Sequence, residues 1–176
     1  METKKLESIL RSSKSAVFFG GAGVSTESGI PDFRSANGLF YAELGTASPK
    51  GILHRNFFFA HTDLFYRFYK EHMVYTNARP NSAHKKLAEL ERAGKLTGVI
   101  TQNIDGLHID AGSVNVLELH GSVRRNFCIK CGRKFPLEYI IEAQGVPRCA
   151  CGGIVKPDVV LYGEALDDET ITKSVS

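Results

Sequence analysis

The 176-residue chain lacks the sequence features of a membrane or secreted protein. No apolar run approaches the ~20 residues that a membrane-spanning helix needs. The N-terminal segment METKKLESIL has neither the apolar core nor the cleavage site of a signal peptide. Internal repeats and low-complexity segments are also absent. We therefore expect a globular, cytoplasmic protein with no membrane partner, in which the cysteines are reduced.

A large excess of positive charge is missing too. The net charge is +3, and the pI of about 8.7 is only mildly basic. Such a balance fits a protein that meets anionic ligands, but it is too weak to indicate nucleic acid, which we do not expect as a partner. The length is sufficient for one hydrophobic core and a small additional module.

Helices and strands alternate along the chain. Apolar spacing predicts helices over residues 3–13, 54–75 and 82–94, and a last one that starts at Asp167. Ser82 is the expected N-cap of the third helix, and Gly94 follows its end. Short apolar runs predict buried strands over residues 15–20, 96–103, 114–121 and 158–164. The alternation indicates an α/β fold with a Rossmann-type parallel sheet of these strands.

A glycine-rich turn follows the first predicted strand, in the stretch GGAGVSTESGIPDFRS of residues 20–35. Gly21 and Gly23 allow a close approach of the backbone, and a helix start directly after them suits a diphosphate. The usual third glycine is missing, however, because Thr26 stands in its place. The acidic residue that binds ribose in hydride-transferring enzymes is missing as well, which disfavours an oxidoreductase. A tight turn without a ligand remains the alternative.

Polar residues follow two other predicted strands. Gln102, Asn103 and Asp105 come directly after one strand, and His120 with Gly121 ends the next. The carboxyl ends of parallel strands share one edge of the sheet, where ligands bind. These side chains are either caps of loops or the walls of one polar site.

All four cysteines lie close together in sequence. They form Cys128-x-x-Cys131 and, after 17 residues, Cys149-x-Cys151. Two close pairs of thiolates suit a tetrahedral zinc ion with a closed shell, which stabilises a fold and leaves no position for a reacting water. A redox pair and two disulfides are the alternatives.

Several stretches of the chain together carry a family resemblance, namely GAGVSTESGIPDFRS, TQNID, HG and the cysteines followed by IVKPDVVLYGE. The chain resembles the sirtuins, the NAD-dependent protein deacylases, from about Ser8 to Ser174. The resemblance implies a Rossmann-type NAD-binding domain of residues 1–36, 80–122 and 157–176. It also implies a helical insertion of residues 37–79 and a zinc-binding module of residues 123–156. Sirtuins continue beyond this point with a Gly-Thr-Ser loop, so the domain is expected to be incomplete on the adenine side.

The resemblance also implies the site residues. Contacts to NAD are expected from Gly21, Ala22, Gly23, Thr26, Asp32, Phe33, Arg34, Gln102, Asn103, Ile104, Asp105 and His120. Ala22 and Thr26 would lie along the diphosphate, and Asp105 would take the nicotinamide carboxamide. The acetylated lysine of a protein or peptide would bind beside the backbone of Val159, Val160, Leu161, Tyr162 and Gly163, as an added strand.

In the chemistry that the resemblance implies, the acyl-lysine oxygen attacks the ribose carbon and displaces nicotinamide. His120 then acts as general base on a ribose hydroxyl, which captures the acyl carbon. The acyl group is thus transferred from lysine to ADP-ribose. Relatives that remove acidic acyl groups share a Tyr-x-x-Arg, but here Tyr66 is followed by Tyr69 in place of the arginine. We therefore expect an acetyl or another uncharged acyl group.

Two further functions remain open. ADP-ribosyl transfer to protein shares the first chemical step. A non-enzymatic zinc module that binds nucleic acid would use the basic residues near the cysteines, which are Arg124, Arg125, Lys130, Arg133 and Lys134. Solvated surface charge is the simpler explanation for these side chains.

Overall fold

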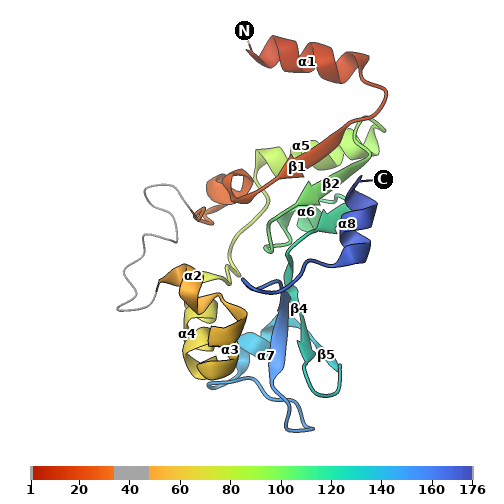
Figure 1. Ribbon diagram of the computed structural model, residues 1–176. Helices are drawn as coiled ribbons and strands as arrows, with labels where there is room; N and C mark the ends of the chain where they lie inside the picture. The colour runs from red at the N-terminus through yellow and green to blue at the C-terminus, as the bar shows by residue number, and fades with distance from the viewer. Residues whose placement is uncertain (1, 34–47, 176) are drawn as a thin grey trace.

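The computed structural model describes residues 2–33 and 48–175, so the expected NAD contact Arg34 lies outside the described residues. Figure 1 shows two lobes. The large lobe contains α1 Glu2–Ser12, β1 Val17–Gly20, the 3₁₀ helix η1 Ala22–Ser28, α5 Ser82–Arg92, β2 Gly98–Thr101, α6 Leu107–Asp110, β3 Val116–Glu118 and α8 Asp168–Val175. The small lobe contains α2 Pro49–Ile52, α3 Arg55–Ala60, α4 Thr62–His72, β4 Gly121–Cys128, β5 Lys134–Phe135, α7 Leu137–Glu142 and β6 Val155–Val159.

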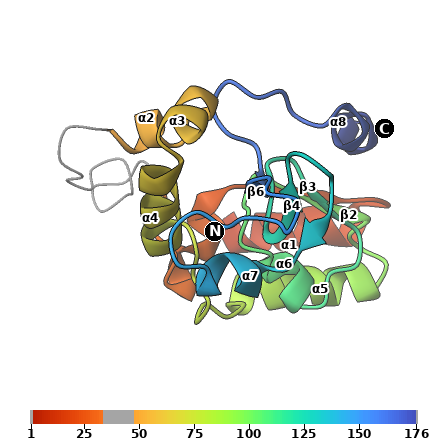
Figure 2. The ribbon, with the colours of Figure 1, turned by 90° about the horizontal axis from the view of Figure 1, so that it is seen from below.

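The large lobe is built on a three-stranded parallel sheet in the order β1-β2-β3. The central strand β2 is the most buried, as its uninterrupted apolar run predicts. Helices α5 and α6 lie on one side of the sheet, and α8 lies on the other (Figure 2). The predicted α/β fold is therefore confirmed, with the carboxyl ends of β1 and β2 facing the small lobe.

The fourth predicted strand, residues 158–164, is not part of the parallel sheet. Strand β6 pairs antiparallel with β4 in a second sheet of order β5-β4-β6. Beyond Val159 the chain turns away, since the N–H of Tyr162 bonds to the carbonyl of Leu53 at 3.0 Å. An apolar run shows that a strand is buried but does not show which partner it pairs with, which explains the error.

Aromatic side chains of residues 54–75, where the sequence predicts a helix, form the core of the small lobe. The fully or almost fully buried rings are Phe58, Phe65, Tyr66, Phe68 and Tyr69. Phe58 packs edge-on against Phe65, with ring centroids 4.9 Å apart. This core joins α3 and α4 to the antiparallel sheet through Val155 and Cys128.

The N-terminus of α5 is capped by Asn81 and not by the predicted Ser82. The Asn81 side chain accepts hydrogen bonds from the backbone of Ala83 and His84, and the His84 ring accepts one from the backbone N–H of Asn81. The reciprocal bonds form a capping box in which histidine takes the usual place of Glu or Gln. Gly94, with φ of +68°, follows the helix as predicted. Among the helices of the described ranges, none combines the length and hydropathy needed to cross a bilayer.

Candidate active site

A cavity of about 820 Å³ lies between the two lobes. The predicted site residues on its wall are Ala22, Asp32, Phe33, Gln102, Asn103, Ile104, Asp105, His120, Val159, Val160, Leu161 and Tyr162. Gly21, Gly23, Thr26 and Gly163 were predicted as well, but they are not part of the wall. Residues that are far apart in sequence thus meet at the carboxyl edge of the parallel sheet, as the topology rule for such sheets predicts.

The carboxylate of Asp105 is held from two sides. Its Oδ1 accepts a hydrogen bond from the backbone N–H of Leu107 at 2.8 Å, and its Oδ2 accepts one from the Ser25 hydroxyl at 2.7 Å. The Ser25 oxygen in turn accepts a bond from the side-chain amide of Asn103 at 3.0 Å. Ser25 and Asn103 are buried. Asp105 therefore presents a fixed acceptor to the cavity, with lone pairs left for a ligand N–H group.

His84 completes this cluster from α5. Its Nδ1 accepts the N–H of Asn81, so the ring proton is assigned to Nε2, which lies 3.5 Å from the Ser25 hydroxyl oxygen. Burial lowers the pKa of His84, and the nearby charge of Asp105 opposes that shift. The neutral ring therefore directs its N–H toward Ser25, and Ser25 directs its own proton toward Asp105.

His108 packs against His84, with ring centroids 4.7 Å apart. It is buried, and neither of its ring nitrogens has a hydrogen-bond partner among the described residues. Burial, with His84 beside it, lowers the pKa of His108 to about 4. The sequence analysis missed Ser25, His84 and His108. The available signal was the spacing of His84 and Ala88, which lie four residues apart on the buried face of α5.

His120 lies where β3 ends and β4 begins. Its Nδ1 is 2.9 Å from the carbonyl oxygen of Gln102. A carbonyl can only accept, so Nδ1 carries the proton and Nε2 is left as the acceptor. The carbonyl of His120 accepts the backbone N–H of Val160 at 3.0 Å, which ties the histidine to the predicted substrate strand. This arrangement leaves Nε2 as the ring nitrogen that can accept a proton, as a general base requires.

Gly121 allows the segment around His120 to lie close to the segment around Val160. Its φ is +74°, and a Cβ built there would lie 1.9 Å from the carbonyl oxygen of Asp158. A side chain at this position would push β4 away from β6, and with it His120 from Val160.

A buried lysine shapes the loop after β6. The ammonium group of Lys156 donates to the carbonyl of Val159 and to the carboxylate of Glu164, each at 3.0 Å. The same carboxylate accepts the backbone N–H of Leu161 at 2.9 Å. The backbone of Tyr162 is also engaged, by Leu53 and by the N–H of Arg55 at 2.9 Å. The loop is therefore held in a defined shape by bonds from both sides.

Tyr66 and Tyr69 do not line the cavity. Tyr69 is fully buried and stacks on Phe65, with ring centroids 5.6 Å apart, and the Tyr66 hydroxyl donates to the carbonyl of Val155. Burial raises the pKa of both hydroxyls. The structure therefore places the Tyr-x-x-Tyr pair in the aromatic core of the small lobe and not on the cavity wall.

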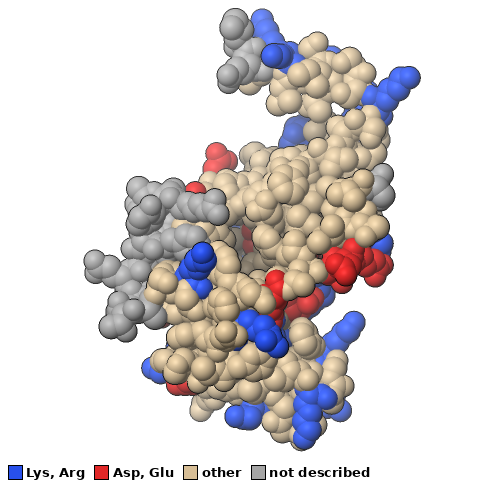
Figure 3. All heavy atoms as spheres, viewed as in Figure 1, with Lys and Arg blue, Asp and Glu red and all other residues tan. Residues whose placement is uncertain are grey.

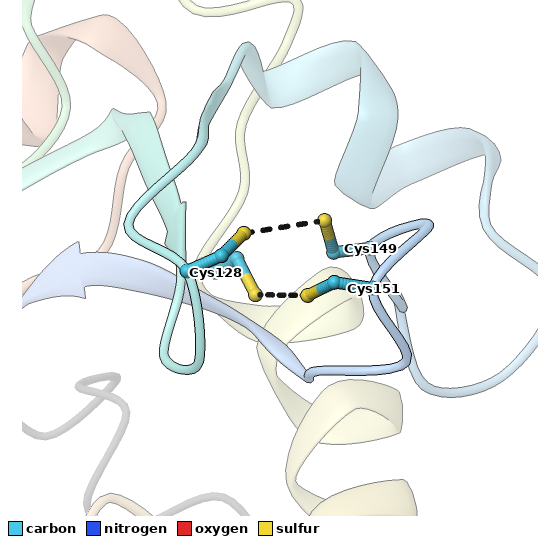
Figure 4. Close-up of side chains that lie close together, drawn as sticks. Cys128, Cys149 and Cys151 are labelled. Carbon is cyan, nitrogen blue, oxygen red and sulfur yellow. Dashed lines mark hydrogen bonds between the residues drawn. The ribbon is translucent and has the colours of Figure 1, made fainter.

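The four cysteines form a compact cluster (Figure 4). All four sulfur atoms lie within 4.8 Å of one another, and none is in a disulfide. Cys128 and Cys151 are separated by 3.5 Å between sulfur atoms, and Cys131 and Cys149 by 3.7 Å. Four sulfurs at ~2.3 Å from one zinc ion would be separated by about 3.8 Å, so the cluster fits such an ion.

The backbone around the cysteines also suits a thiolate. Gly132 and Gly152, both with positive φ, donate their N–H groups to the carbonyls of Cys128 and Cys149 and close two tight turns. The backbone N–H of Arg133 acts to lower the pKa of the Cys131 thiol, but the neighbouring thiols of Cys151 and Cys128 outweigh it and raise that pKa. Burial acts to raise the pKa of the Cys128 thiol, but the backbone N–H groups of Cys131 and Lys130 outweigh it and lower that pKa. The turns and the N–H groups prepare the sulfur to act as a metal ligand.

Comparisons with known proteins agree with this geometry. The model of the Sir2 family matches residues 21–176. An NAD-dependent protein deacetylase of Clostridium perfringens is 56% identical over 173 residues, which cover 97% of this chain and 71% of that protein. A solved structure of Sir2 with a p53 peptide and NAD+ has a TM-score of 0.85 and 38% identity, and the match covers 99% of this chain and 70% of that chain. A Sir2 variant with a deacetylated p53 peptide and 3'-O-acetyl ADP ribose has a TM-score of 0.90 and 39% identity, with 99% and 71% covered.

Proposed function

Because the chain belongs to the Sir2 family, we propose that it is an NAD-dependent protein-lysine deacetylase. The overall reaction converts acetyl-lysine, NAD and water into lysine, nicotinamide and O-acetyl-ADP-ribose. NAD supplies the ADP-ribosyl group, which is activated because nicotinamide can leave. The observation that carries the proposal is one cavity whose wall contains Asp105, His120 and the segment from Val159 to Leu161.

Asp105 is proposed to orient the nicotinamide end. Its carboxylate is fixed by Ser25 and Leu107, and it would accept the N–H groups of the carboxamide. The glycine-rich segment would hold the diphosphate through Gly21, Ala22, Gly23 and Thr26. Asp32, Phe33, Gln102, Asn103 and Ile104 would form the ribose side and the walls of the nicotinamide pocket, and Arg34 is proposed on sequence grounds alone.

His120 is proposed as the general base. Its proton lies on Nδ1, against the carbonyl of Gln102, so Nε2 can take a proton from a ribose hydroxyl. That hydroxyl would then bond to the acyl carbon, and the proton would pass to the lysine nitrogen as its bond to this carbon breaks. Water would add to the same carbon as its bond to the oxygen on the first ribose carbon breaks, which leaves O-acetyl-ADP-ribose. Loss of a general base typically costs roughly 10²–10⁴-fold in rate.

The substrate peptide is proposed to add as a strand beside residues 159–163. The backbone N–H and carbonyl of Tyr162 are already paired with Leu53 and Arg55. The N–H of Val160 is paired with His120. We therefore expect the peptide to pair through the carbonyl of Val160 and the backbone of Gly163.

The cysteine cluster is proposed to hold a structural zinc ion through Cys128, Cys131, Cys149 and Cys151. All four ligands come from the protein, so the ion would stabilise the small lobe and take no part in the reaction. Acetyl is proposed as the preferred acyl group. The cytoplasmic location and the absence of a nucleic-acid partner remain predictions.

The test is to incubate the protein with an acetyl-lysine peptide and NAD and to identify the products by mass spectrometry. We expect deacetylated peptide, nicotinamide and O-acetyl-ADP-ribose in equal amounts. His120→Ala should abolish most of the deacetylation, whereas His61→Ala, which changes an exposed histidine outside the cavity wall, should not. ADP-ribose attached to a protein, with no O-acetyl product, would instead support ADP-ribosyl transfer. Formation of NADH would support an oxidoreductase.

A further inference from the structure

Strand β4 contains an irregularity at the junction of the lobes. Ser122 stands opposite Asp158, and Asn126 stands opposite the neighbouring Pro157, so residues 123–125 form a bulge. Bulges re-aim side chains that would otherwise alternate across a sheet. Here the bulge contains two consecutive arginines, Arg124 and Arg125. Figure 3 shows acidic side chains gathered near this junction and basic side chains on the small lobe below it.

Arg125 binds two strands. One is β3, which ends shortly before the predicted base His120, and the other is β6, whose last residue is the predicted substrate contact Val159. Its Nη1 donates to Glu118 at 2.6 Å, and its Nε donates to Asp158 at 2.8 Å. Glu118 lies two residues before His120, and Asp158 lies directly before Val159. The Glu118 side chain is only 6% exposed. One guanidinium group therefore connects the two segments that meet at the bond between Val160 and His120.

Arg124 binds the opposite side of the site. Its guanidinium makes a two-point contact with the carboxylate of Asp110 on α6, in which Nη1 lies 2.6 Å from Oδ1. It also packs on Gly106, because a Cβ built there would lie 2.5 Å from its Nε. Gly106 directly follows Asp105, so Arg124 fixes the segment that carries the proposed nicotinamide contact.

We propose that Arg124 and Arg125 are positioning residues that attach the small lobe separately to the two halves of the active site. Arg125 fixes the base strand against the substrate strand, and Arg124 fixes the Asp105 segment. This inference rests on the proposed function. Both guanidinium groups are engaged by carboxylates, which argues against the alternative that they form part of a nucleic-acid surface. An ordinary exposed ion pair contributes little to the free energy of folding. A planar guanidinium group that binds carboxylates on two strands also fixes how those strands lie relative to each other.

The two arginines should produce different defects. Arg125→Met should raise the KM for the acetyl-lysine peptide about tenfold and change kcat less, because small displacements of bound groups are costly. Arg124→Met should instead lower the affinity for nicotinamide, measured in the exchange reaction, about tenfold and leave the peptide KM nearly unchanged. Arg67→Met is the matched control, since Arg67 forms an exposed ion pair with Asp63 within α4 and should change neither quantity.

A second set of measurements separates positioning from stability. Arg125→Met removes the ion-pair partner of the buried Glu118, which destabilises the fold. Adding Glu118→Gln should restore the thermal midpoint but not the peptide KM. Arg125→Lys should restore only part of the affinity, because one ammonium group cannot bind both carboxylates in the geometry of the fork. The amide of Val160 should exchange its hydrogen faster in Arg125→Met, with the amides of α5 unchanged, as measured by NMR.

Unchanged peptide affinity and unchanged Val160 exchange in Arg125→Met would overturn the inference while the proposed function stood. The same loss of peptide and nicotinamide binding in both variants would also overturn it, because it would indicate a general structural role. If the unmodified protein bound no acetyl-lysine peptide, the proposed function would fail. The Val160 exchange would still decide whether Arg125 holds the two strands together.

Discussion

The two lobes are stabilised in different ways. The small lobe has a continuous core of aromatic and aliphatic side chains that includes Phe58, Phe65 and Tyr69. The large lobe has few buried apolar residues, and on β1 the side chains of Val17 and Phe19 are 56% and 61% exposed. Near the cavity the large lobe buries the apolar Leu107 together with several polar residues, namely Ser25, Asn103 and the two histidines His84 and His108. Apolar burial therefore stabilises the small lobe, whereas hydrogen bonds fix the polar groups around Asp105, the proposed nicotinamide contact.

The largest expected effect is on the small lobe, through its proposed metal. Cys128→Ala should release the ion and unfold β4–β6, with a loss on the order of 10 kcal/mol of binding free energy that is also folding free energy. Metal analysis and amide hydrogen exchange would measure this, and the strands β1–β3 should be protected longer than β4–β6. Removal of metal from the unmodified protein by a chelator, followed by return of zinc, is the control. Full protection of β4–β6 in a metal-free sample would contradict the prediction.

A pair of phenylalanine substitutions tests the difference in packing directly. Phe65→Ala removes a fully buried ring from the small lobe and should lower the free energy of unfolding by about 3–5 kcal/mol. Phe19→Ala removes an exposed ring from the large lobe and should change it by less than about 0.5 kcal/mol. Denaturant titrations of both variants would measure these values. Equal losses would show that the two lobes do not differ in the way described.

The histidine pair should make the large lobe sensitive to acid. The pKa of His108 is about 4 in the folded chain against 6.5 ordinarily, because the ring is buried. Between these values the unfolded chain binds a proton that the folded chain excludes. The contribution of His108 to the free energy of unfolding is therefore fully present above pH 6.5. It falls by about 3 kcal/mol as the pH drops toward 4.

His108→Leu should remove most of this dependence, and the remainder should come from His84, whose pKa burial also lowers. The variant also removes two buried nitrogen atoms that have no hydrogen-bond partner in the part of the chain that the structure describes, so it should not destabilise the protein at pH 7. Urea titrations between pH 4 and pH 8 would test this, with His61→Leu as the exposed control. An unchanged slope in His108→Leu would assign the acid sensitivity to other groups.

The smallest expected effect concerns the hydrogen bond from His84 to Ser25. His84→Leu removes the N–H that faces the serine oxygen at 3.5 Å. We expect a loss of about 1 kcal/mol in nicotinamide affinity, or roughly fivefold, because Asp105 would be less firmly oriented. The nicotinamide exchange reaction would measure it, and the peptide KM should not change. A tenfold change in the peptide KM would mean that His84 acts on both halves of the site.

Sequence reasoning identified what depends on local patterns. The fold class, the clustering of the four cysteines and the placement of His120 and Asp105 on one cavity could be predicted from strand ends and spacing. The polar cluster could not, since Ser25 meets His84 across 59 residues and Asp105 across 80. Which residues form such bonds depends on tertiary packing. The same limit explains why residues 158–164 were assigned to the wrong sheet.

The oxygen that orients His120 belongs to the backbone of Gln102. A backbone carbonyl is present whatever side chain the codon specifies, so a substitution at position 102 leaves the tautomer of His120 unchanged as long as β2 keeps its path. A carboxylate in the same role could be lost through a single nucleotide change. The tautomer of His120 therefore depends on the path of the backbone and not on the side chain at position 102. Most substitutions near the site should leave this tautomer unchanged.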